Sequence, residues 1–520
     1  MWKKTTKIMT SILLMVMVSL IAAGCGGMDG QDKKSTADNK KEENKVSGKK
    51  KTRDDVIIYS ELVPETLDQH DSVTVATAIY VRNLYANLYR LDTDGNVVPE
   101  LAENYSVNDD YTEYTITLKK GIQFSDGSPI TADDVVYTYR RGMNSEVTYY
   151  EELKNVEAKD DQTVVITLNQ PNNEFLNDLT VEYMCVMSKD AIENGMDVAG
   201  HPDITSGAYT VEQWDKGESI LLKANPYYFD GEPAIKTAKI IFKLPAETAY
   251  QAMKNKEVDY LTSVSVDQVP YLQADDDVDL IAYDNFAWNF MMLNEEDPRF
   301  ADQNVRSAIY YALDLNYIID TALDGRGTPA PIPVNGLIEG YMEGCDDVEF
   351  DLNKAKEYMA ASAYPEGFDM TIEVNNDERE KVAEAIGTLL SEIGIHVTVE
   401  KEEINQLLSN ASKHTYEASI TSYSMSSGTV AHAAPLFRPG DSLNFAATTD
   451  GEIVELLEKA SSVEPEKKKE ILSKVYQLME EKNIYIGLYW PTVYDAKNVE
   501  LKQKEMVTSE KFVIANMYWE

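Results

Sequence analysis

The sequence predicts an α/β protein with two lobes, and three observations support this prediction. The chain has 520 residues, which is more than one hydrophobic core normally serves, so we expect two lobes. Residues 115–141 read as a half-buried strand, a polar turn and a helix. Residues 351–399 contain two helical patterns and then a turn into a strand, so the second half alternates α and β as an open α/β sheet would.

The chain begins with the features of a secretory signal. Three lysines precede an apolar run from Ile8 to Ala23 that is too short and wrongly flanked for a membrane-spanning helix, so we expect residues 1–24 to be a signal peptide. The end of this run resembles the bacterial lipobox, with Ala22 where that motif more often has leucine. The resemblance implies that Cys25 becomes the lipidated first residue of the mature chain. The alternative is ordinary cleavage that leaves a free Cys25.

Residues 25–54 are expected to form a lipidated flexible tether. Between Gly26 and Arg53 only three residues are apolar. Such a composition cannot bury enough surface to offset the entropy of ordering. The globular body therefore begins near residue 55, where Val56–Tyr59 has the pattern of a strand.

Composition and absent motifs exclude several classes of protein. The net charge of −41 argues against nucleic-acid binding, which depends on neutralising phosphates with lysine and arginine. The motifs H-E-x-x-H, C-x-x-C, G-x-S-x-G, Walker A and G-x-G-x-x-G are absent, and the five histidines never come in ligand-spaced pairs. We therefore expect no enzyme activity, no metal site and no cofactor. Cys185 and Cys345 are far apart in sequence and are expected to be free, mostly buried thiols.

Periodicity predicts further elements along the body. The spacing of Ala78, Tyr85 and Leu88–Tyr89 indicates a helix. The apolar run 287–294 indicates a strand where the chain crosses between lobes, and residues 304–314 indicate a helix with one buried face. In the segment 115–141 the helix is expected to start at Thr131, with Asp134 as the partner of a capping box.

The segment 115–141 also carries a resemblance to a known family. It resembles the pattern L-(R/K)-x-G-(V/I)-x-F-x-D-G-x-P-(L/I)-T-A-x-D-V of the large solute-binding proteins of peptide and nickel ABC importers. The matching positions are Leu118, Gly121, Ile122, Phe124, Asp126, Gly127, Pro129, Ile130, Thr131, Ala132, Asp134 and Val135. In this family the segment is scaffold, so it identifies the fold without containing the site.

Other landmarks of the family extend the resemblance from about Val56 to Tyr494. The loop 64–71 resembles an element whose following residues lie at the ligand cleft, although Gln69 replaces the usual proline. Residues 304–314 resemble the family's V-R-x-A-I-x-x-A-(L/I)-D helix, in which we expect Arg306 to be a structural ion-pair partner. Residues 484–490 resemble the strand that closes the second lobe.

The resemblance implies a two-lobed periplasmic-binding-protein-like fold of type II, in the large cluster C form, with an extra subdomain in the first lobe. We expect lobe I to comprise residues 55–286 and 496–520, with the inserted subdomain at about 97–198. Lobe II is expected to comprise residues 287–495.

The ligand site is expected between the lobes. In peptide-binding relatives an acidic residue of the second lobe pairs with the peptide's amino terminus, and residues 420–428 are the matching stretch. If Tyr423 aligns with the family's tyrosine, Ser422 and Met425 stand where the acids would be. A buried ammonium without a partner costs several kcal/mol. Either Asp71 of the facing loop supplies the charge, or the ligand has no free amine at that point.

The hydroxyl-rich run from Ser422 to Ser427 could also bind a sugar, a carboxylate or a peptide backbone, or be a plain serine-rich loop. His432 would suit a metal chelate or a ligand carboxylate, with a satisfied surface histidine as the alternative. Aromatic walls are expected from residues such as Trp288, Tyr423, Tyr489 and Trp490. The full set of candidate ligand-binding residues is Asp71, Ser72, Val73, Trp288, Asn289, Ser422, Tyr423, Ser424, Ser426, His432, Tyr489 and Trp490.

The function implied is that of a lipid-anchored substrate-binding protein of an ABC importer. It would capture an oligopeptide or dipeptide between its lobes and deliver it to ABC permease subunits with their ATPases. The expected location is the outer face of the cytoplasmic membrane, which means the cell surface in a Gram-positive organism and the periplasm otherwise. We expect a monomer that binds no nucleic acid. The alternatives are a binder of a nickel chelate, opine or sugar on the same scaffold, or a peptide-sensing receptor.

Overall fold

The structure is a computed structural model that describes residues 53–72, 74–93, 95–145, 147–265, 268–284, 286–425, 428–504 and 513–520. The expected signal peptide and tether, with Cys25, lie outside these residues. Across the described ranges, no helix combines the length and apolarity that a membrane crossing requires.

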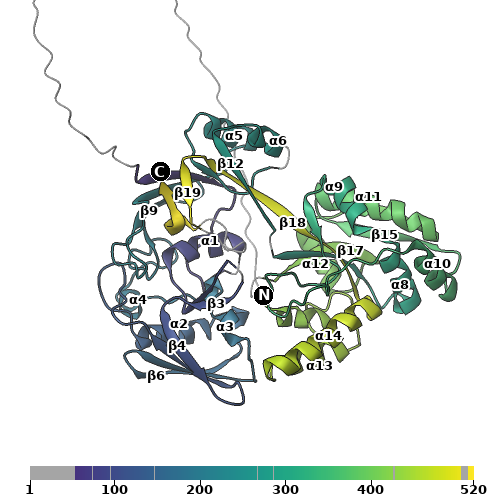
Figure 1. Cartoon of the computed structure of the whole chain (residues 1–520), viewed down its shortest axis with the longest axis horizontal. Coiled ribbons are helices and arrows are strands. Elements are labelled where there is room, and N and C mark those ends of the chain that lie inside the picture. Colours follow the sequence, from purple (N-terminus) through teal and green to yellow (C-terminus); the bar gives the residue numbers. More distant parts are fainter. Residues whose placement is uncertain are drawn as a thin grey trace, which may run out of the picture. The chain divides into compact units, whose positions relative to one another are not determined.

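A twelve-stranded sheet runs through the body of the protein (Figure 1). Its strands are β1 (Asp55–Ser60), β8 (Tyr209–Asp215), β9 (Ser219–Ala224), β10 (Thr237–Phe242), β11 (Tyr260–Leu261), β12 (Val278–Asp284), β13 (Ala287–Leu293), β14 (Gly327–Pro329), β15 (Phe368–Val374), β16 (Ile395–Lys401), β17 (Ala418–Ser424) and β18 (Tyr485–Asn498). Their order is β16-β15-β17-β13-β18-β11-β1-β10-β9-β8, and β12 and β14 also pair with β18.

Strand β18 connects the two parts of this sheet. Its residues 485–489 pair with β13, and its residues 492–498 pair with β12. In Figure 1 it is the long yellow strand that runs from one part to the other. The part beyond β13 contains the parallel pairs β15–β16 and β15–β17, as predicted for an α/β sheet.

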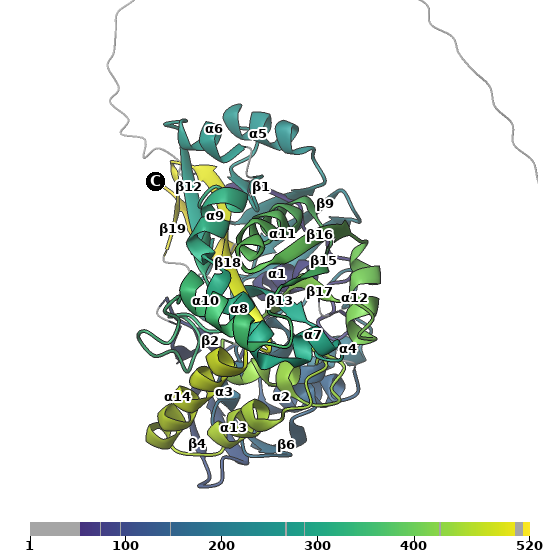
Figure 2. The same cartoon turned by 90° about the vertical axis from the view of Figure 1, so that its right-hand side faces the viewer.

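Helices cover both faces of the sheet part formed by β13 and β15–β17 (Figure 2). The helices of the protein are α1 (Val75–Leu84), α2 (Ala132–Gly142), α3 (Phe175–Asp178), α4 (Lys189–Glu193), α5 (Ala246–Lys254), α6 (Val269–Gln273), α7 (Pro298–Ala301), α8 (Gln303–Ala312), α9 (Leu315–Leu323), α10 (Leu352–Ala361), α11 (Asp377–Leu390), α12 (Ile404–Ser412), α13 (Glu452–Ala460) and α14 (Pro465–Lys482). Strand β13 alternates between the two cores, because Trp288 and Phe290 face the core of α12–α14 whereas Met291 faces that of α8–α11.

A separate antiparallel sheet has the order β4-β5-β7-β6. Its strands are β4 (Ala102–Val107), β5 (Glu113–Leu118), β6 (Leu153–Asp160) and β7 (Thr163–Leu168), and the hairpin of β2 (Tyr89–Leu91) and β3 (Val97–Pro99) precedes it. Strand β5 and helix α2 are the strand and helix predicted from residues 115–141. The predicted capping box is confirmed, because Asp134 accepts hydrogen bonds from the backbone N–H and the hydroxyl of Thr131.

One predicted helix is longer than the observed one. Helix α1 ends at Leu84, and Tyr89 begins β2, so the expected continuation to Tyr89 is wrong. The carbonyls of Ala86 and Leu88 accept hydrogen bonds from the N–H groups of Val186 and Glu100, at 2.8 and 2.9 Å. Contacts with distant segments thus replace the helical hydrogen bonds that the local spacing predicts.

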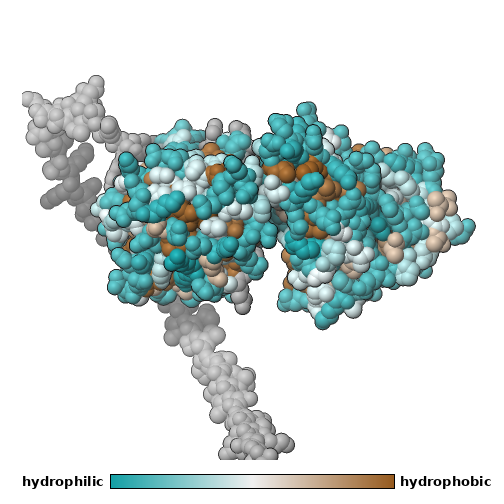
Figure 3. Space-filling view, turned by 90° about the horizontal axis from the view of Figure 1, so that it is seen from below, coloured by the Kyte–Doolittle hydropathy of each residue, from teal (hydrophilic) through white to brown (hydrophobic). Residues whose placement is uncertain are grey.

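Apolar side chains gather in five cores, whereas the face in Figure 3 is mostly hydrophilic. Three cores lie among residues 56–283 and the segment from 496 to the C-terminus, and two lie among residues 286–490. We propose that these two groups correspond to the predicted lobes. Below, the first lobe means residues 55–286 with 496–520, and the second lobe means residues 287–495.

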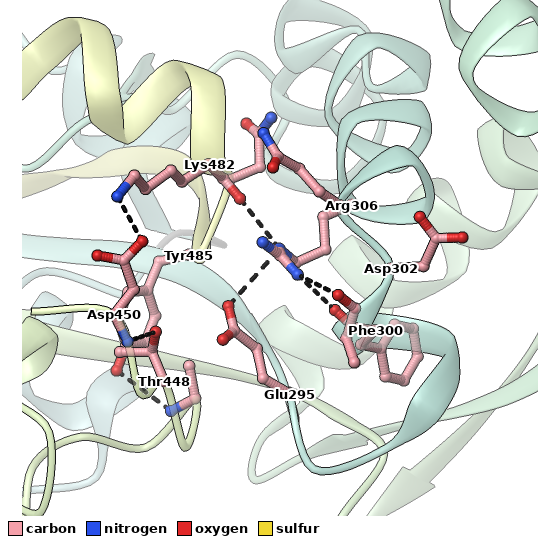
Figure 4. A network of polar contacts seen from close by, with 12 residues as sticks. Glu295, Phe300, Asp302, Arg306, Thr448, Asp450, Lys482 and Tyr485 are labelled. Atoms are coloured by element: carbon pink, nitrogen blue, oxygen red, sulfur yellow. Dashed lines mark hydrogen bonds and ion pairs between the residues drawn. The ribbon is translucent and has the colours of Figure 1, made fainter. Parts of the chain in front are cut away.

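Arg306 has the structural role predicted for it (Figure 4). Its Nε lies 3.6 Å from Glu295 Oε1 and donates to the carbonyl of Lys482 at 3.0 Å. Its Nη1 donates to the carbonyl of Phe300 at 2.7 Å. Burial lowers the pKa of Arg306, and the carboxylate of Glu295 opposes that shift. A nearby carboxylate and backbone carbonyls therefore satisfy this buried guanidinium.

Among the described residues, neither Cys185 nor Cys345 forms a disulfide, as predicted. Cys185 is buried in a first-lobe core, and Cys345 is half-buried against a second-lobe core. Burial raises the pKa of the Cys345 thiol, so the group is protonated and weakly nucleophilic at neutral pH.

Candidate functional site

The first lobe contains an open pocket of about 1020 Å³. It lies between the loop that precedes α1 and the exposed side of α2. That loop contains Asp71 and Ser72, so two of the predicted site residues line the pocket. The lining residues are His70, Asp71, Ser72, Asp133, Val136, Tyr137, Arg140, Arg141, Asn144, Ser145, Val147 and Lys189.

An ion pair and a histidine form one wall of the pocket. Both terminal nitrogens of Arg141 donate to the buried carboxylate of Asp68, and Nη1 also donates to Nδ1 of His70 at 2.6 Å. The imidazole Nε2 lies 2.8 Å from the hydroxyl of Tyr150. Because Nδ1 accepts a hydrogen bond, His70 is neutral with its proton on Nε2. Burial and the neighbouring Arg141 lower the pKa of His70 to about 4.

The remaining charges of the pocket are of both signs. Asp71, Asp133 and Arg140 are exposed there, and Lys189 is half-buried. Tyr137 adds an aromatic surface beside them. This lining can meet a ligand that carries both an ammonium and a carboxylate.

In the second lobe, the predicted stretch lies at the end of β17. Ser422 pairs in register with Asn289 of β13, so these two predicted residues lie together. Arg379, in the first turn of α11, donates from Nη2 to the hydroxyl oxygen of Ser422 at 2.9 Å and to the amide oxygen of Asn289 at 3.1 Å. Sequence reasoning missed Arg379. One signal could have found it. The helix dipole favours acids over cations in the first turn of a helix, so an arginine at that position is unusual.

Aromatic contacts connect the two lobes beside these residues. The ring of His432 makes edge contacts with Tyr149 of the first lobe and Tyr423 of the second, with centroids 5.8 and 5.6 Å apart. The hydroxyl of Tyr423 donates to the carbonyl of His432 at 3.1 Å. Burial lowers the pKa of His432 to about 4, so it is neutral. Tyr149 lies two residues after Val147, which lines the pocket.

Several predicted site residues do not line an open site in this structure. The side chains of Trp288, Tyr489 and Trp490 are at most 1% exposed, so the expectation that they form aromatic walls is wrong here. The indole of Trp288 donates to the carbonyl of Ala330 at 2.9 Å, and the hydroxyl of Tyr489 donates to Glu378 at 3.0 Å. These strands are covered on both faces, so their aromatic side chains enter cores.

The other predicted residues differ in how much they are exposed. Ser424 is exposed at the end of β17. Val73 and Ser426 lie outside the described residues. Met425, which is expected at one of the family's acidic positions if Tyr423 aligns with the family's tyrosine, is fully buried in a core. Of the predicted second-lobe residues, Asn289, Ser422, Tyr423 and His432 are therefore the ones that the structure connects to polar or interlobe contacts.

A buried ionic cluster also joins the lobes. The ammonium of Lys468 of α14 contacts the carboxyl group of Glu174, which precedes α3, and pairs with the carboxylate of Glu339 at 2.7 Å. The hydroxyl of Thr429 donates to Glu174. Beside it the amide of Asn173 donates to the carbonyl of Ala460 at 3.1 Å. Glu174 and Lys468 are both less than a tenth exposed, so this contact between lobes excludes water.

Comparisons with known proteins agree with this architecture. The family model of the bacterial extracellular solute-binding proteins, family 5 Middle, matches residues 96–441. The chain is 26% identical over 557 residues to the oligopeptide-binding protein AppA of Bacillus subtilis (strain 168), covering 99% of each chain.

Two solved structures show the same fold. The structure of AppA from Bacillus subtilis in complex with a nonapeptide matches with a TM-score of 0.71 and 25% identity, covering 90% of this chain and 99% of that one. The ABC transporter substrate-binding protein CtaP of Listeria monocytogenes matches with a TM-score of 0.82 and 21% identity, covering 90% and 100%. These likenesses confirm the predicted fold class.

Proposed function

Because the chain belongs to the bacterial extracellular solute-binding proteins of family 5, we infer that it captures a peptide between its two lobes for import. Membership makes it a solute-binding protein of ABC transport and not an enzyme. That the solute is a peptide is a more specific inference than family membership alone gives. It is consistent with the oligopeptide-binding relative that aligns with nearly the whole chain.

The observation that carries this proposal is the open first-lobe pocket and its position. At about 1020 Å³ it is at the upper end of the range for small-molecule pockets. Charged groups of both signs line it, as a zwitterionic peptide requires. The contact of Tyr149 with His432 brings the second lobe close to this pocket, so a ligand there would be within reach of residues 422–424.

Closure on the ligand would occur by rotation about the strands that join the lobes. Strand β18 passes through both sheet parts, and β12 ends three residues before β13 begins. Two-lobed binding proteins close by hinge motion of this kind. The bound peptide would then be presented by a monomer to ABC permease subunits and their ATPases, with Cys25 as the lipid anchor at the outer face of the cytoplasmic membrane.

A thermal-shift screen tests the proposal. Mature protein is heated with a peptide library, and with sugars, opines and nickel chelates as comparison sets. A ligand at a hundredfold excess over its dissociation constant stabilises the folded state by about 2.7 kcal/mol, which is a measurable rise in melting temperature. We expect a peptide to give this rise and to be recovered unchanged. A response confined to the sugars or chelates would contradict the proposal.

A further inference from the structure

The guanidinium of Arg379 is a half-buried cation with only neutral partners. Nη1 donates to the amide oxygen of Asn375 at 2.6 Å, and Nη2 donates to Ser422 and Asn289. Nε also donates to the amide oxygen of Asn289, at 3.3 Å. Among the described residues, no carboxylate oxygen lies within 4 Å of the guanidinium nitrogens of Arg379. Burial lowers the pKa of Arg379, an effect that nearby Tyr489 and Glu378 oppose.

Other arginines of the chain that are removed from solvent have acidic partners. Arg141 pairs with Asp68, and Arg299 pairs with Asp297 and Glu417. Burying a charge without a counter-charge is costly, and removing one partner of a buried pair typically costs several kcal/mol. Arg379 therefore carries an electrostatic cost that Tyr489 and Glu378 offset only in part.

The geometry of the long hydrogen bonds shows which edge of Arg379 is available. Nε and Nη2 both point at the one amide oxygen of Asn289, at 3.3 and 3.1 Å. Charge-assisted bonds to a carboxylate are shorter, at about 2.7–2.9 Å, and this edge of a guanidinium fits the two oxygens of a carboxylate. Within the described residues the hydroxyl of Ser422 accepts from Arg379 and donates to no other group, so its proton can serve a second acceptor.

The position of this group is that of the predicted ligand site. Ser422 and Asn289 pair across β17 and β13, close to the crossing between lobes. Tyr423, the next residue, contacts His432, which in turn contacts Tyr149 of the first lobe. In this stretch the family resemblance leads to the expectation of an acid for a ligand ammonium, but the structure has a cation there.

We propose that Arg379, with Ser422 and Asn289, forms a subsite for a carboxylate of the ligand. The carboxylate takes the Nε–Nη2 edge of Arg379, displaces the amide oxygen of Asn289 from it, and accepts a hydrogen bond from Ser422. This inference deepens the proposed function and rests on it for the location of the ligand. For a peptide, the carboxylate is either the C-terminal one or a side chain of aspartate or glutamate.

The first test uses small anions and does not depend on peptide binding. Melting temperatures of the mature protein are measured with succinate and with succinamide at matched ionic strength. We expect succinate to raise the melting temperature of the wild type more than succinamide does, and the difference to vanish in Arg379→Met. The matched control is Arg438→Met, because Arg438 of the same lobe is partly exposed and paired with Asp441 and Glu458. This control should retain the full difference.

The second test uses three peptides in calorimetry, namely trialanine, trialaninamide and Ala-Glu-Ala-amide. Hydrogen bonds to charged groups are worth about 1.5–3 kcal/mol, so loss of the paired carboxylate should weaken binding by about tenfold or more. Weaker binding of both amides than of trialanine assigns the C-terminal carboxylate. Weak binding of trialaninamide with restored binding of Ala-Glu-Ala-amide assigns an acidic side chain. Either preference should disappear in Arg379→Met and be reduced in Arg379→Lys, which keeps the charge without the two-pronged edge.

The outcomes separate this inference from the proposed function. If the peptides bind, but neither the succinate effect nor the preference among the peptides changes in Arg379→Met, the carboxylate subsite is wrong while peptide binding stands. If no peptide binds but the succinate effect requires Arg379, the subsite stands and the peptide proposal fails. If succinate acts equally on the wild type and Arg379→Met and no peptide binds, the inference is overturned together with the proposed function.

Discussion

The buried carboxyl of Glu174 predicts that the contact between lobes depends on pH. Burial, together with the neighbouring Glu339, raises the pKa of Glu174 from its ordinary value of 4.5 to about 8, although Lys468 opposes the shift. Because the folded state then binds this proton more tightly than the unfolded state does, the contribution to stability is fully present below 4.5 and is lost as pH rises through about 8. At about 1.4 kcal/mol for each tenfold change in an equilibrium, the whole effect is at most about 5 kcal/mol.

Replacing Glu174 with glutamine isolates this effect. The amide imitates the protonated carboxyl and still accepts from Thr429, but it does not titrate. Between about pH 6 and pH 9 the wild type should lose about 3 kcal/mol of unfolding free energy that Glu174→Gln retains. Burial also raises the pKa of Asp178, and the charges of Glu152 and Glu174 add to that shift. Asp178 therefore titrates in both proteins, and only the part of its shift that depends on the charge of Glu174 is lost in Glu174→Gln. The pKa of Glu339 is lowered, so its contribution is lost only on acidification.

The assay is urea denaturation followed by tryptophan fluorescence across this pH range. The matched control is Glu458→Gln, which removes an exposed carboxyl paired with Arg438 and should leave the pH profile unchanged. Parallel profiles for the wild type and Glu174→Gln would refute the reasoning, because Glu174 would then be ionised throughout the range in the folded protein as it is in the unfolded chain.

Three further predictions concern the anchor, the ligand amine and the joining strand. Cys25→Ser should release the protein into the medium or leave it uncleaved, because only a thiol accepts the lipid; processed protein that still fractionates with the membrane would contradict the lipobox interpretation. N-acetylation of a bound peptide should cost less than about tenfold in affinity by calorimetry, unless Asp71 binds the amine. In that case a larger loss should disappear in Asp71→Asn. Gly487→Ala should lower the unfolding free energy by about 1–3 kcal/mol in urea titrations, because an added Cβ would lie 2.2 Å from the carbonyl oxygen of Ala330. An unchanged urea midpoint in Gly487→Ala would show that β18 can move to accommodate the added Cβ without loss of unfolding free energy.

Local signals in the sequence were sufficient for much of the fold. The capping box of Thr131 and Asp134 fixes the start of α2. The side chain of Asp351 caps α10 by accepting hydrogen bonds from the backbone N–H groups of Asn353 and Lys354. Gly394, with φ of 81°, ends the helical segment before β16, which is a conformation that glycine adopts without strain. Each of these signals acts within a few residues, so it is visible without knowledge of tertiary structure.

The aromatic walls show where such signals stop. Trp288 and Trp490 lie on apolar strands, and an apolar strand can face a ligand cleft or a helix-covered core. The choice depends on which helices cover each face. Here α12–α14 cover one face and α8–α11 the other, so both indoles are buried. Nothing in the residues around either tryptophan distinguishes these alternatives.

Arg306 and Arg379 show the same limit for charge. Both are helical arginines. In sequence Arg379 has more acidic neighbours than Arg306, since Glu378 and Glu380 flank it. In the folded chain Glu378 accepts from Tyr489 and Glu380 pairs with Lys401, whereas Arg306 gains Glu295 from a distant segment. Tertiary contacts thus engage the acids that flank Arg379 in sequence and leave its guanidinium with hydrogen-bond partners that are all neutral. A sequence pattern counts charges, but only the register of strands and helices determines which of them remain unpaired.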